Sequence, residues 1–346
     1  MKKKQRITAA LVIILSGLTF FILHNKKKST LDEDLKNFAI EDTSTIDKIF
    51  IAEKAGATAL LERKRKGYWT INGKYPANME SVNILLYTFR RTEVKYPAGE
   101  KARLTVIRSI ATNGKKVEVY QDGKRTRIWY VGDATPDHVG TFMVLADPET
   151  DEKYEQPFIN WIPGFDGYLT TRFFTNESDW RDRNLIAVLP TEIESIKMDY
   201  NGMPDSSFQL GVKSVNSFDV KNQKGQPLPA VDTLAVKQYL AYFMNLGVAG
   251  YLTDKSKRTI DSLRRTAPFA VLNLKLKSGE KKEFKFYHKK PEAGQEKLYE
   301  QQFQYDPDNV YVSFMNDKDM ALVQYFVFGK VFQTSSYFMP RMVKRN

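Results

Sequence analysis

Hydrophobic residues form one long uncharged run near the N-terminus, over residues 7–23, with lysines on both sides. A helix of this length spans roughly 26 Å, within the range of membrane-crossing helices. The pattern predicts a transmembrane helix over residues 7–24 after a cytoplasmic N-terminus, residues 1–6. A cleaved signal peptide is the alternative, but no small-residue cleavage site follows the run before Lys26. The charged flanks favour this orientation only slightly, because they are nearly balanced.

Beyond this run the pattern changes to short alternating segments. Residues 25–45 are polar and aperiodic, which is typical of a linker. A first folded unit is predicted over residues 46–150. It opens with strand-like segments and continues with a helix over residues 79–91, where apolar residues recur at helical spacing. A hairpin with an Asp-Gly turn at Asp122 and a last strand at residues 140–145 complete it.

The same order of elements returns in the second half of the chain. A helix over residues 231–246, with Leu234 expected to face inward, is followed by a hairpin with a Ser-Gly turn at Ser278. The offset between the halves is about 150 residues, as in proteins built from a repeated unit. We therefore predict an α+β protein with two tandem repeats of β-β-α-β-β-β. Each repeat is an antiparallel sheet with a packed helix, and the second covers residues 193–346 with a C-terminal helix. An α+β chain without duplication is the alternative.

Charge and cysteine content narrow the class of protein. The net charge is +12, but seven lysines and arginines lie within residues 1–28, which contain no acid. Cations that flank an apolar helix contact lipid headgroups, whereas a nucleic-acid-binding domain concentrates them on its folded surface. The membrane is therefore an expected partner and nucleic acid is not. The absence of cysteine excludes disulfides, thiolate metal sites and a lipid-modified N-terminal cysteine.

Motifs for catalysis or cofactor binding are not legible in the sequence. The histidines at positions 24, 138 and 288 have no second ligand at helical or hairpin spacing. Signatures of a nucleophile elbow, a phosphate loop and a dinucleotide-binding turn do not occur. Carboxylates such as Glu177 and Asp179 lie in a polar run typical of solvent-exposed surface. We expect no cofactor, no metal and no enzyme activity, unless the fold brings dispersed groups together.

The segment between the predicted repeats, residues 151–192, is rich in aromatic residues. Aromatic residues and arginine are enriched at binding surfaces. Pro163 and Gly164 prevent a helix, so a loop is expected to leave part of this segment exposed. The candidate binding residues are Trp161, Phe165, Tyr168 and Arg172. Packing between the two halves is the alternative, since aromatic clusters usually form core.

The end of this segment carries a resemblance to a known family. Trp180-Arg181-Asp182-Arg183 can form charge-assisted pairs locally, so Trp180, Arg181 and Asp182 are predicted to stabilise the junction. With Ile162-Pro163-Gly164-Phe165 and Trp69-Thr70-Ile71-Asn72-Gly73, this motif resembles the "domain of unknown function 4340" family of Bacteroidota-type bacteria. Other members of the family accompany gliding-motility-type ABC transporters as membrane-tethered partners, so the resemblance implies an auxiliary role. The family has no accepted catalytic residues to carry over.

These features predict a single-pass protein of the inner (cytoplasmic) membrane whose C-terminal domain lies in the periplasm. Its expected role is non-catalytic binding or scaffolding within an envelope protein complex. A hydrolase acting on glycan or peptidoglycan is the alternative. A binding protein predicts an exposed aromatic surface, whereas a hydrolase predicts a deep cleft with two or more convergent titratable groups of shifted pKa.

Overall fold

The computed structural model describes residues 33–253, 255–292, 297–298 and 301–340. The predicted cytoplasmic N-terminus and transmembrane helix, residues 1–24, lie outside the described residues. Within the described ranges, no helix combines the length and the apolar character needed to cross a membrane. The chain divides into two compact units, Met1–Arg181 and Asp182–Asn346, and both are α+β with a large antiparallel sheet.

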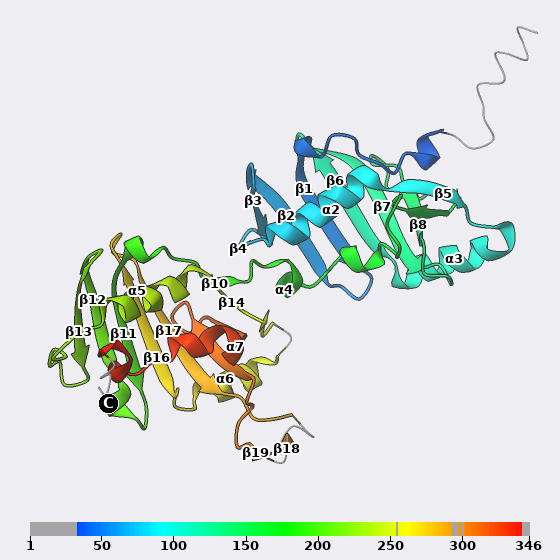
Figure 1. Ribbon diagram of the computed structural model, residues 1–346. Coiled ribbons are helices and arrows are strands. Elements are labelled where there is room, and N and C mark those ends of the chain that lie inside the picture. The colour runs from blue at the N-terminus through cyan, green and yellow to red at the C-terminus, as the bar shows by residue number, and fades with distance from the viewer. Residues whose placement is uncertain (1–32, 254, 293–296, 299–300, 341–346) are drawn as a thin grey trace, which may run out of the picture. The chain divides into compact units, whose positions relative to one another are not determined.

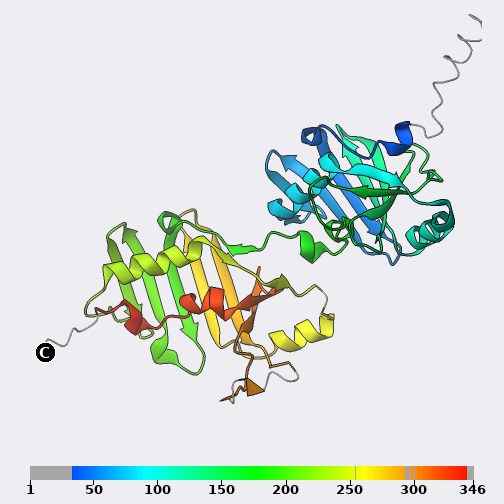
Figure 2. The same ribbon diagram turned by 45° about the vertical axis from the view of Figure 1, so that its right-hand side comes forward.

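The described part of the first unit forms a nine-stranded sheet in the order β4-β3-β2-β1-β6-β7-β8-β9-β5, with antiparallel pairing throughout. Its strands are β1 (Ile46–Glu53), β2 (Thr58–Arg65), β3 (Tyr68–Ile71), β4 (Tyr75–Pro76), β5 (Glu93–Pro97), β6 (Lys115–Gln121), β7 (Lys124–Ala134), β8 (Thr141–Ala146) and β9 (Phe158–Trp161). Helix α2 (Met79–Arg91) crosses one face of this sheet (Figures 1 and 2). On α3 (Glu100–Asn113), Val106 and Ile110 pack against Val144 of β8, in a cluster separate from the main core.

The described part of the second unit forms an eight-stranded sheet in the order β13-β12-β11-β16-β17-β20-β21-β15. Its strands are β11 (Ile193–Tyr200), β12 (Phe208–Ser214), β13 (Ser217–Asn222), β15 (Gly250–Tyr251), β16 (Ala270–Leu276), β17 (Lys281–His288), β20 (Asn309–Phe314) and β21 (Asp319–Gln324). The strand pairs β10 (Asn184–Ile186) with β14 (Leu246–Gly247), and β18 (Lys297–Leu298) with β19 (Gln301–Gln302), lie outside this sheet. Its helices are α5 (Thr233–Ala241), α6 (Lys257–Arg264) and α7 (Tyr325–Phe328), of which α5 crosses one face of the sheet (Figures 1 and 2).

The two sheets have the same strand order when their strands are matched in chain order. The first sheet from β3 to β5 corresponds strand for strand to the second from β13 to β15, and β4 is an addition at one edge. Hydrogen bonds outside the sheets correspond as well. The backbone N–H of Ile40 donates to the carbonyl of Phe89 at 2.8 Å, and that of Val188 donates to the carbonyl of Phe243 at 2.9 Å. In each unit the segment that precedes the first strand is thus tied to the end of the main helical segment.

A second pair of corresponding bonds closes the other end of each main helix. Asn78 is the N-cap of α2, and its backbone N–H donates to the carbonyl of Trp180 at 2.7 Å. Asp232 is the N-cap of α5, and its backbone N–H donates to the carbonyl of Phe338 at 2.8 Å. Both aromatic side chains are fully buried. In both units, the chain after the last strand of the large sheet returns to the start of the main helix, where a buried aromatic residue accepts a bond from the N-cap.

The apolar pattern predicted the helices that correspond to α2 and α5, and it did not predict α3 or α6. The helix predicted over residues 79–91 is α2, with the same bounds. The helix predicted over residues 231–246 is shorter, because α5 ends at Ala241 and a 3-10 turn follows. Leu234, predicted to face inward, is instead 74% exposed. It lies in the first turn of α5, where the N-cap Asp232 fixes the start of the helix and turns this position toward solvent.

The predicted β-β-α-β-β-β order is too short for either unit. Strand β5 shows no inward alternation because it is an edge strand, with four of its five residues exposed. Strand β9 lies in the aromatic segment predicted to connect the repeats, yet it pairs with β5 and β8 inside the first sheet. Phe38 and Ile40, in the predicted linker, are buried in the core of the first unit. The first unit therefore extends beyond residues 46–150 on both sides.

Candidate functional site

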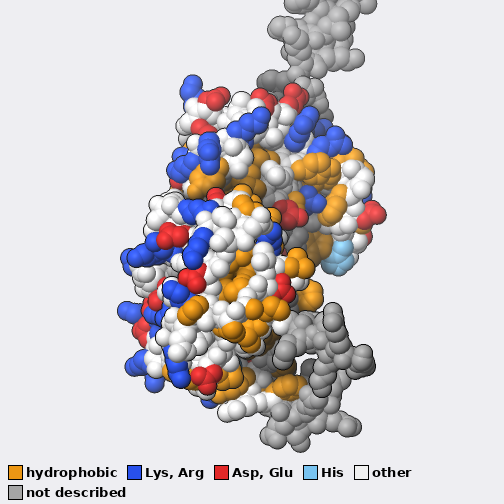
Figure 3. Space-filling model, turned by 60° about the vertical axis from the view of Figure 1, so that its left-hand side comes forward, with side chains coloured by type: hydrophobic (Ala, Val, Ile, Leu, Met, Phe, Trp, Pro, Cys, Tyr) orange, Lys and Arg blue, Asp and Glu red, His pale blue; other side chains and the backbone are white. Residues whose placement is uncertain are grey.

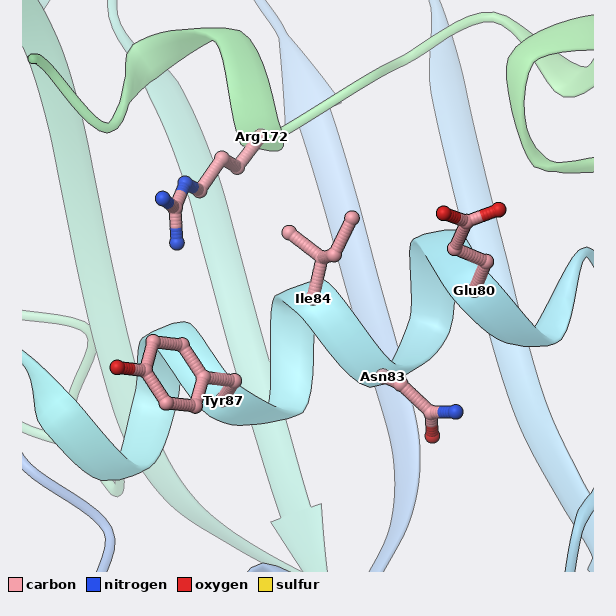
Figure 4. Close-up of a pocket in the computed structure, with 5 residues that line it drawn as sticks. All are labelled: Glu80, Asn83, Ile84, Tyr87 and Arg172. Atoms are coloured by element: carbon pink, nitrogen blue, oxygen red, sulfur yellow. The ribbon is translucent and has the colours of Figure 1, made fainter. Parts of the chain in front are cut away.

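An open groove of about 730 Å³ lies along α2 in the first unit. Its lining residues are Glu80, Asn83, Ile84, Tyr87 and Arg172. Figure 4 shows Arg172 reaching from the segment above the helix toward the turns that carry Ile84 and Tyr87. The groove therefore joins two parts of the chain that are distant in sequence.

Helical periodicity explains why α2 contributes both core and groove residues. Leu85 and Phe89 are buried, four residues apart, against the sheet. Glu80, Ile84 and Tyr87 recur at spacings of four and three residues on another stripe of the same helix. Ile84 is 46% exposed and Tyr87 is 51% exposed. The helix thus presents an aliphatic and an aromatic side chain to solvent beside the groove.

Arg172 ends the short 3-10 helix Thr170–Arg172 and is held on two sides. Its Nη1 donates to the Thr88 hydroxyl at 2.8 Å. Its guanidinium carbon lies 4.3 Å from the centroid of the Phe165 ring. The Thr88 hydroxyl in turn donates to the carbonyl of Ile84 at 2.8 Å, so the cation is linked to the groove wall.

The segment that carries Arg172 is itself fixed to the sheet. The backbone N–H of Leu169 donates to the Thr141 hydroxyl at 2.7 Å. The Thr170 hydroxyl donates to the carbonyl of Gly132, also at 2.7 Å. These bonds tie the segment to β7 and β8, so Arg172 stands on a rigid support.

Arg172 is a half-buried cation in the wall of the groove. Burial lowers the pKa of its guanidinium below the ordinary value, and an arginine remains charged at neutral pH. Within the described part of the chain, no carboxylate forms an ion pair with Arg172. Charges removed from water are normally paired. The groove therefore contains a positive charge without an acidic partner among these residues.

The other two candidate binding residues lie apart from the groove lining. Trp161, in β9, pairs with Glu93 of β5, and its ring lies 5.1 Å from the Lys95 Nζ. Tyr168 lies with its ring centroid 5.8 Å from that of His138. Both Trp161 and Tyr168 are half-buried. The structure brings Phe165 and Arg172 together and gives Trp161 and Tyr168 different neighbours.

The predicted junction residues divide between the two units. Trp180 is buried in the core of the first unit, and its Nε1 donates to the carbonyl of Phe174 at 3.0 Å. The guanidinium of Arg181, also buried, lies 3.6 Å from the centroid of the Tyr75 ring. Asp182 begins the second unit, where its carboxylate accepts from the backbone N–H of Asn184 at 3.1 Å. Trp180 and Arg181 thus complete the first unit.

A cluster of charged groups on β6 and β7 is the strongest alternative for chemistry. The Lys116 Nζ lies 2.8 Å from Glu118 and 2.7 Å from Asp151, and Arg125 lies 3.1 Å from Glu118. Burial alone would raise the pKa of Glu118, but hydrogen bonds from Lys116 and Tyr120 hold that pKa below its ordinary 4.5. Glu118 is therefore ionised at neutral pH and bound by its neighbours, as expected for a structural ion cluster.

Metal ligation has no support in the described residues, which contain no group of three or more His, Asp or Glu side chains placed to share an ion.

The groove residues of α2 were not predicted from sequence. The available signal was Ile84 and Tyr87 at a spacing of three residues, outside the apolar stripe of the helix. These two residues indicate a groove only together with Arg172, which is far away in the sequence.

Comparisons with known proteins identify no family or relative for this chain. No family model matches the chain, and no curated protein or solved structure matches it either. The resemblance to the "domain of unknown function 4340" family stays a prediction.

Proposed function

We propose that this chain is a single-pass protein of the inner membrane whose two units lie in the periplasm and bind another envelope protein without catalysis. The apolar run over residues 7–24, with its lysine flanks, supports the membrane anchor. The observation that carries the binding role is the groove over α2, where exposed Ile84 and Tyr87 lie beside Arg172. The resemblance adds that the partner belongs to an ABC-transporter or gliding-motility-type complex.

The composition and rigidity of the groove fit protein recognition. Tyrosine and arginine are the residue types that dominate the energetics of protein interfaces. Arg172 is fixed by Thr88 and Phe165 before any partner arrives. Binding to a pre-organised side chain loses less conformational entropy than binding to a mobile one. A partner would therefore gain from this contact.

The alternative of a glycan or peptidoglycan hydrolase receives less support. Glycoside hydrolysis needs one carboxyl group with a raised pKa to act as general acid. Each shift resolved for an aspartate or glutamate in the described residues lowers the pKa, as at Glu118, Asp306 and Asp317. These carboxylates are ionised and bonded at neutral pH.

We also infer that the two units arose by duplication of one α+β unit. The shared strand order supports this inference. So does the pair of bonds from the caps Asn78 and Asp232 to the buried aromatic residues Trp180 and Phe338. Because Phe338 repeats the contact of Trp180 at the end of the second unit, that contact closes a unit. A junction between units does not account for it.

Site-specific photo-crosslinking tests the binding role. A benzoylphenylalanine introduced at Ile84 in the full chain, expressed in its own cells, should crosslink to one envelope protein. The same group at Leu234, the more exposed position on α5, is the matched control and should give no such product. Substitution Tyr87→Ser should remove the Ile84 product. Equal crosslinking from Ile84 and Leu234, or none from Ile84, would contradict the proposal.

A further inference from the structure

We propose that the groove over α2 binds an extended peptide segment of the partner protein that carries a carboxylate. A basic side chain lies about four residues from that carboxylate, with an apolar residue midway between them on the same face of the segment. This inference rests on the proposed function, because it assigns a ligand class to the same groove. Arg172, Ile84 and Glu80 each select one part of this pattern.

Arg172 selects the carboxylate. A guanidinium has five N–H donors in a planar fork that matches the two oxygens of a carboxylate. The Nη1 group of Arg172 donates to the Thr88 hydroxyl, and the Phe165 ring lies against the guanidinium. No described carboxylate forms an ion pair with Arg172. A carboxylate from outside the unit would supply the counter-charge that this half-buried cation lacks.

Glu80 selects the basic side chain. It lies in the first turn of α2, is exposed, and forms no ion pair with another described residue. Glu80 and Tyr87, which lines the groove beside Arg172, are seven residues apart, and this corresponds to roughly 10 Å along a helix. An extended peptide advances about 3.3 Å per residue and turns every second side chain to the same face, so two side chains that both face this stretch, with a third between them, lie about four residues apart. Opposite charges about four residues apart on the ligand would therefore meet Arg172 and Glu80 together.

Ile84 selects the apolar residue. It lies on α2 between Glu80 and Tyr87 and is 46% exposed. An apolar side chain placed against Ile84 and Tyr87 would remove both from water, which is favourable in proportion to the apolar surface buried. Recognition of an extended segment through alternating pockets is common in peptide-binding domains.

The same charges disfavour a phosphate ligand, from lipid or nucleic acid. Polyanion sites gather several cations, since each phosphate contact uses one. The groove lining holds one cation, Arg172, and one acid, Glu80. Glu80 would repel a second phosphate along a polyanion. The charge pattern of the groove is dipolar, and so is the proposed ligand.

Selection from random peptides tests the ligand class without assuming a sequence. A phage-displayed library of peptides of about 12 residues, roughly three times the span between the two charges, would be selected on the full chain in detergent micelles. Enriched peptides should carry Asp or Glu with Lys or Arg about four positions away and an apolar residue midway between them. Fluorescein-labelled copies of these peptides should lose at least about tenfold in affinity for Arg172→Gln, measured by anisotropy.

Three controls decide the interpretation. Lys330→Gln is matched to Arg172→Gln, because Lys330 also lies in a 3-10 helix after the last long strand of its unit. Its Nζ lies 5.4 Å from the centroid of the Tyr242 ring. It should leave the affinity unchanged. Glu80→Gln should weaken only the peptides that contain the basic residue. Vesicles of phosphatidylglycerol should not compete.

The outcomes separate this inference from the proposed function. Enriched peptides without an acid, or equal affinity for wild type and Arg172→Gln, would overturn the carboxylate assignment. If such peptides still depend on Tyr87, the groove remains a binding site with another ligand. Competition by vesicles, abolished in Arg172→Gln, would overturn the inference in favour of a lipid phosphate. Loss of the Ile84 crosslink specificity described above would instead contradict the proposed function itself.

Discussion

The guanidinium of Arg172 lies 4.3 Å from the centroid of the Phe165 ring, on the first of the two units. An arginine in this position gains attraction from the ring quadrupole, and its side chain loses its freedom before a ligand binds. Phe165 is half-buried and packs against the core of its unit. Phe165 thus packs against the core on one side and positions the guanidinium of Arg172 on the other.

Removing the buried ring of Trp180 should destabilise the first unit alone. Trp180→Ala leaves a large cavity in a fully buried site, at an expected cost of about 3–5 kcal/mol in free energy of unfolding. Hydrogen exchange followed by mass spectrometry should show faster exchange in peptides from β1 to β9 and unchanged exchange in peptides from β11 to β21. Phe338→Ala should give the reverse pattern. Phe326→Ala is the control, because Phe326 is 95% exposed and should change neither. Faster exchange in both units after either core substitution would refute their independence.

The two corresponding helix caps should contribute similar amounts. The Asn78 side chain accepts from the backbone N–H groups of Glu80 and Ser81, and Asp232 accepts from those of Leu234 and Ala235. Replacing either cap by alanine should cost about 1 kcal/mol in free energy of unfolding, measured by urea denaturation. Asn78→Asp retains the acceptor and should cost little. A loss for Asn78→Asp as large as for Asn78→Ala would mean that the acceptor is not what stabilises α2.

Acid should weaken the second unit through its buried ion pair. Lys289 Nζ lies 2.7 Å from Asp306, and both side chains are largely buried. Burial alone would raise the pKa of Asp306, but the bonds from Lys289 and from the backbone of Asp308 and Asn309 hold that pKa below its ordinary 3.8. Because the folded pKa is depressed, the pair stabilises the fold above about pH 4 and loses this effect as pH falls through the lowered value.

Asp306→Asn should therefore cost about 3 kcal/mol in free energy of unfolding at pH 7, since it leaves the buried Lys289 charge without a full partner. The difference from wild type should shrink as the pH falls from about 4 to about 2. Urea denaturation at several pH values measures this difference. Glu292, the more exposed carboxylate at 3.1 Å from Lys289, provides the control, and Glu292→Gln should have a smaller effect. A pH-independent difference for Asp306→Asn would show that its carboxylate charge is not responsible.

The predicted anchor can be tested on the purified protein. The intact chain should fractionate with membranes and retain its first residues in mass spectrometry, because the apolar run has no cleavage site. A reporter fused after Asn346 should be active only in the periplasm. An N-terminus that maps at or beyond residue 25 would show instead that the run is a cleaved signal peptide.

Local sequence chemistry was sufficient for the parts of the fold that local rules control. The hairpin between β6 and β7 was predicted from its Asp-Gly pair. Asp122 and Gly123 have φ values of 50° and 75°, the left-handed conformation that such a turn needs. The bounds of α2 followed from apolar spacing alone. The resulting α+β assignment, with antiparallel sheets, is confirmed.

Elements stabilised by distant partners could not be predicted in this way. Strand β9, with the sequence Phe-Ile-Asn-Trp, lies between β8 and β5, and its first three residues are buried, so it shows no alternation of polar and apolar positions. Its sequence pattern indicates a connecting segment, not a strand. The groove was missed for the same reason, because Tyr87 and Arg172 are brought together only by the return of the chain across α2. Of the four candidate binding residues, Arg172 lines the groove, and Phe165 contacts the guanidinium of Arg172.

The bond from the Asn78 N–H to the Trp180 carbonyl has a consequence for how the protein is made. Each strand of the first sheet, and the aromatic residue that closes α2, precede Asp182 in the chain. During synthesis from the N-terminus, all strands of this sheet and Trp180 therefore emerge before the second unit does. Its hydrophobic surfaces can be covered while the second half is still being synthesised, so strands of similar pattern from the two halves are not exposed together. The order of emergence would thus protect two units of the same strand order from pairing the wrong strands.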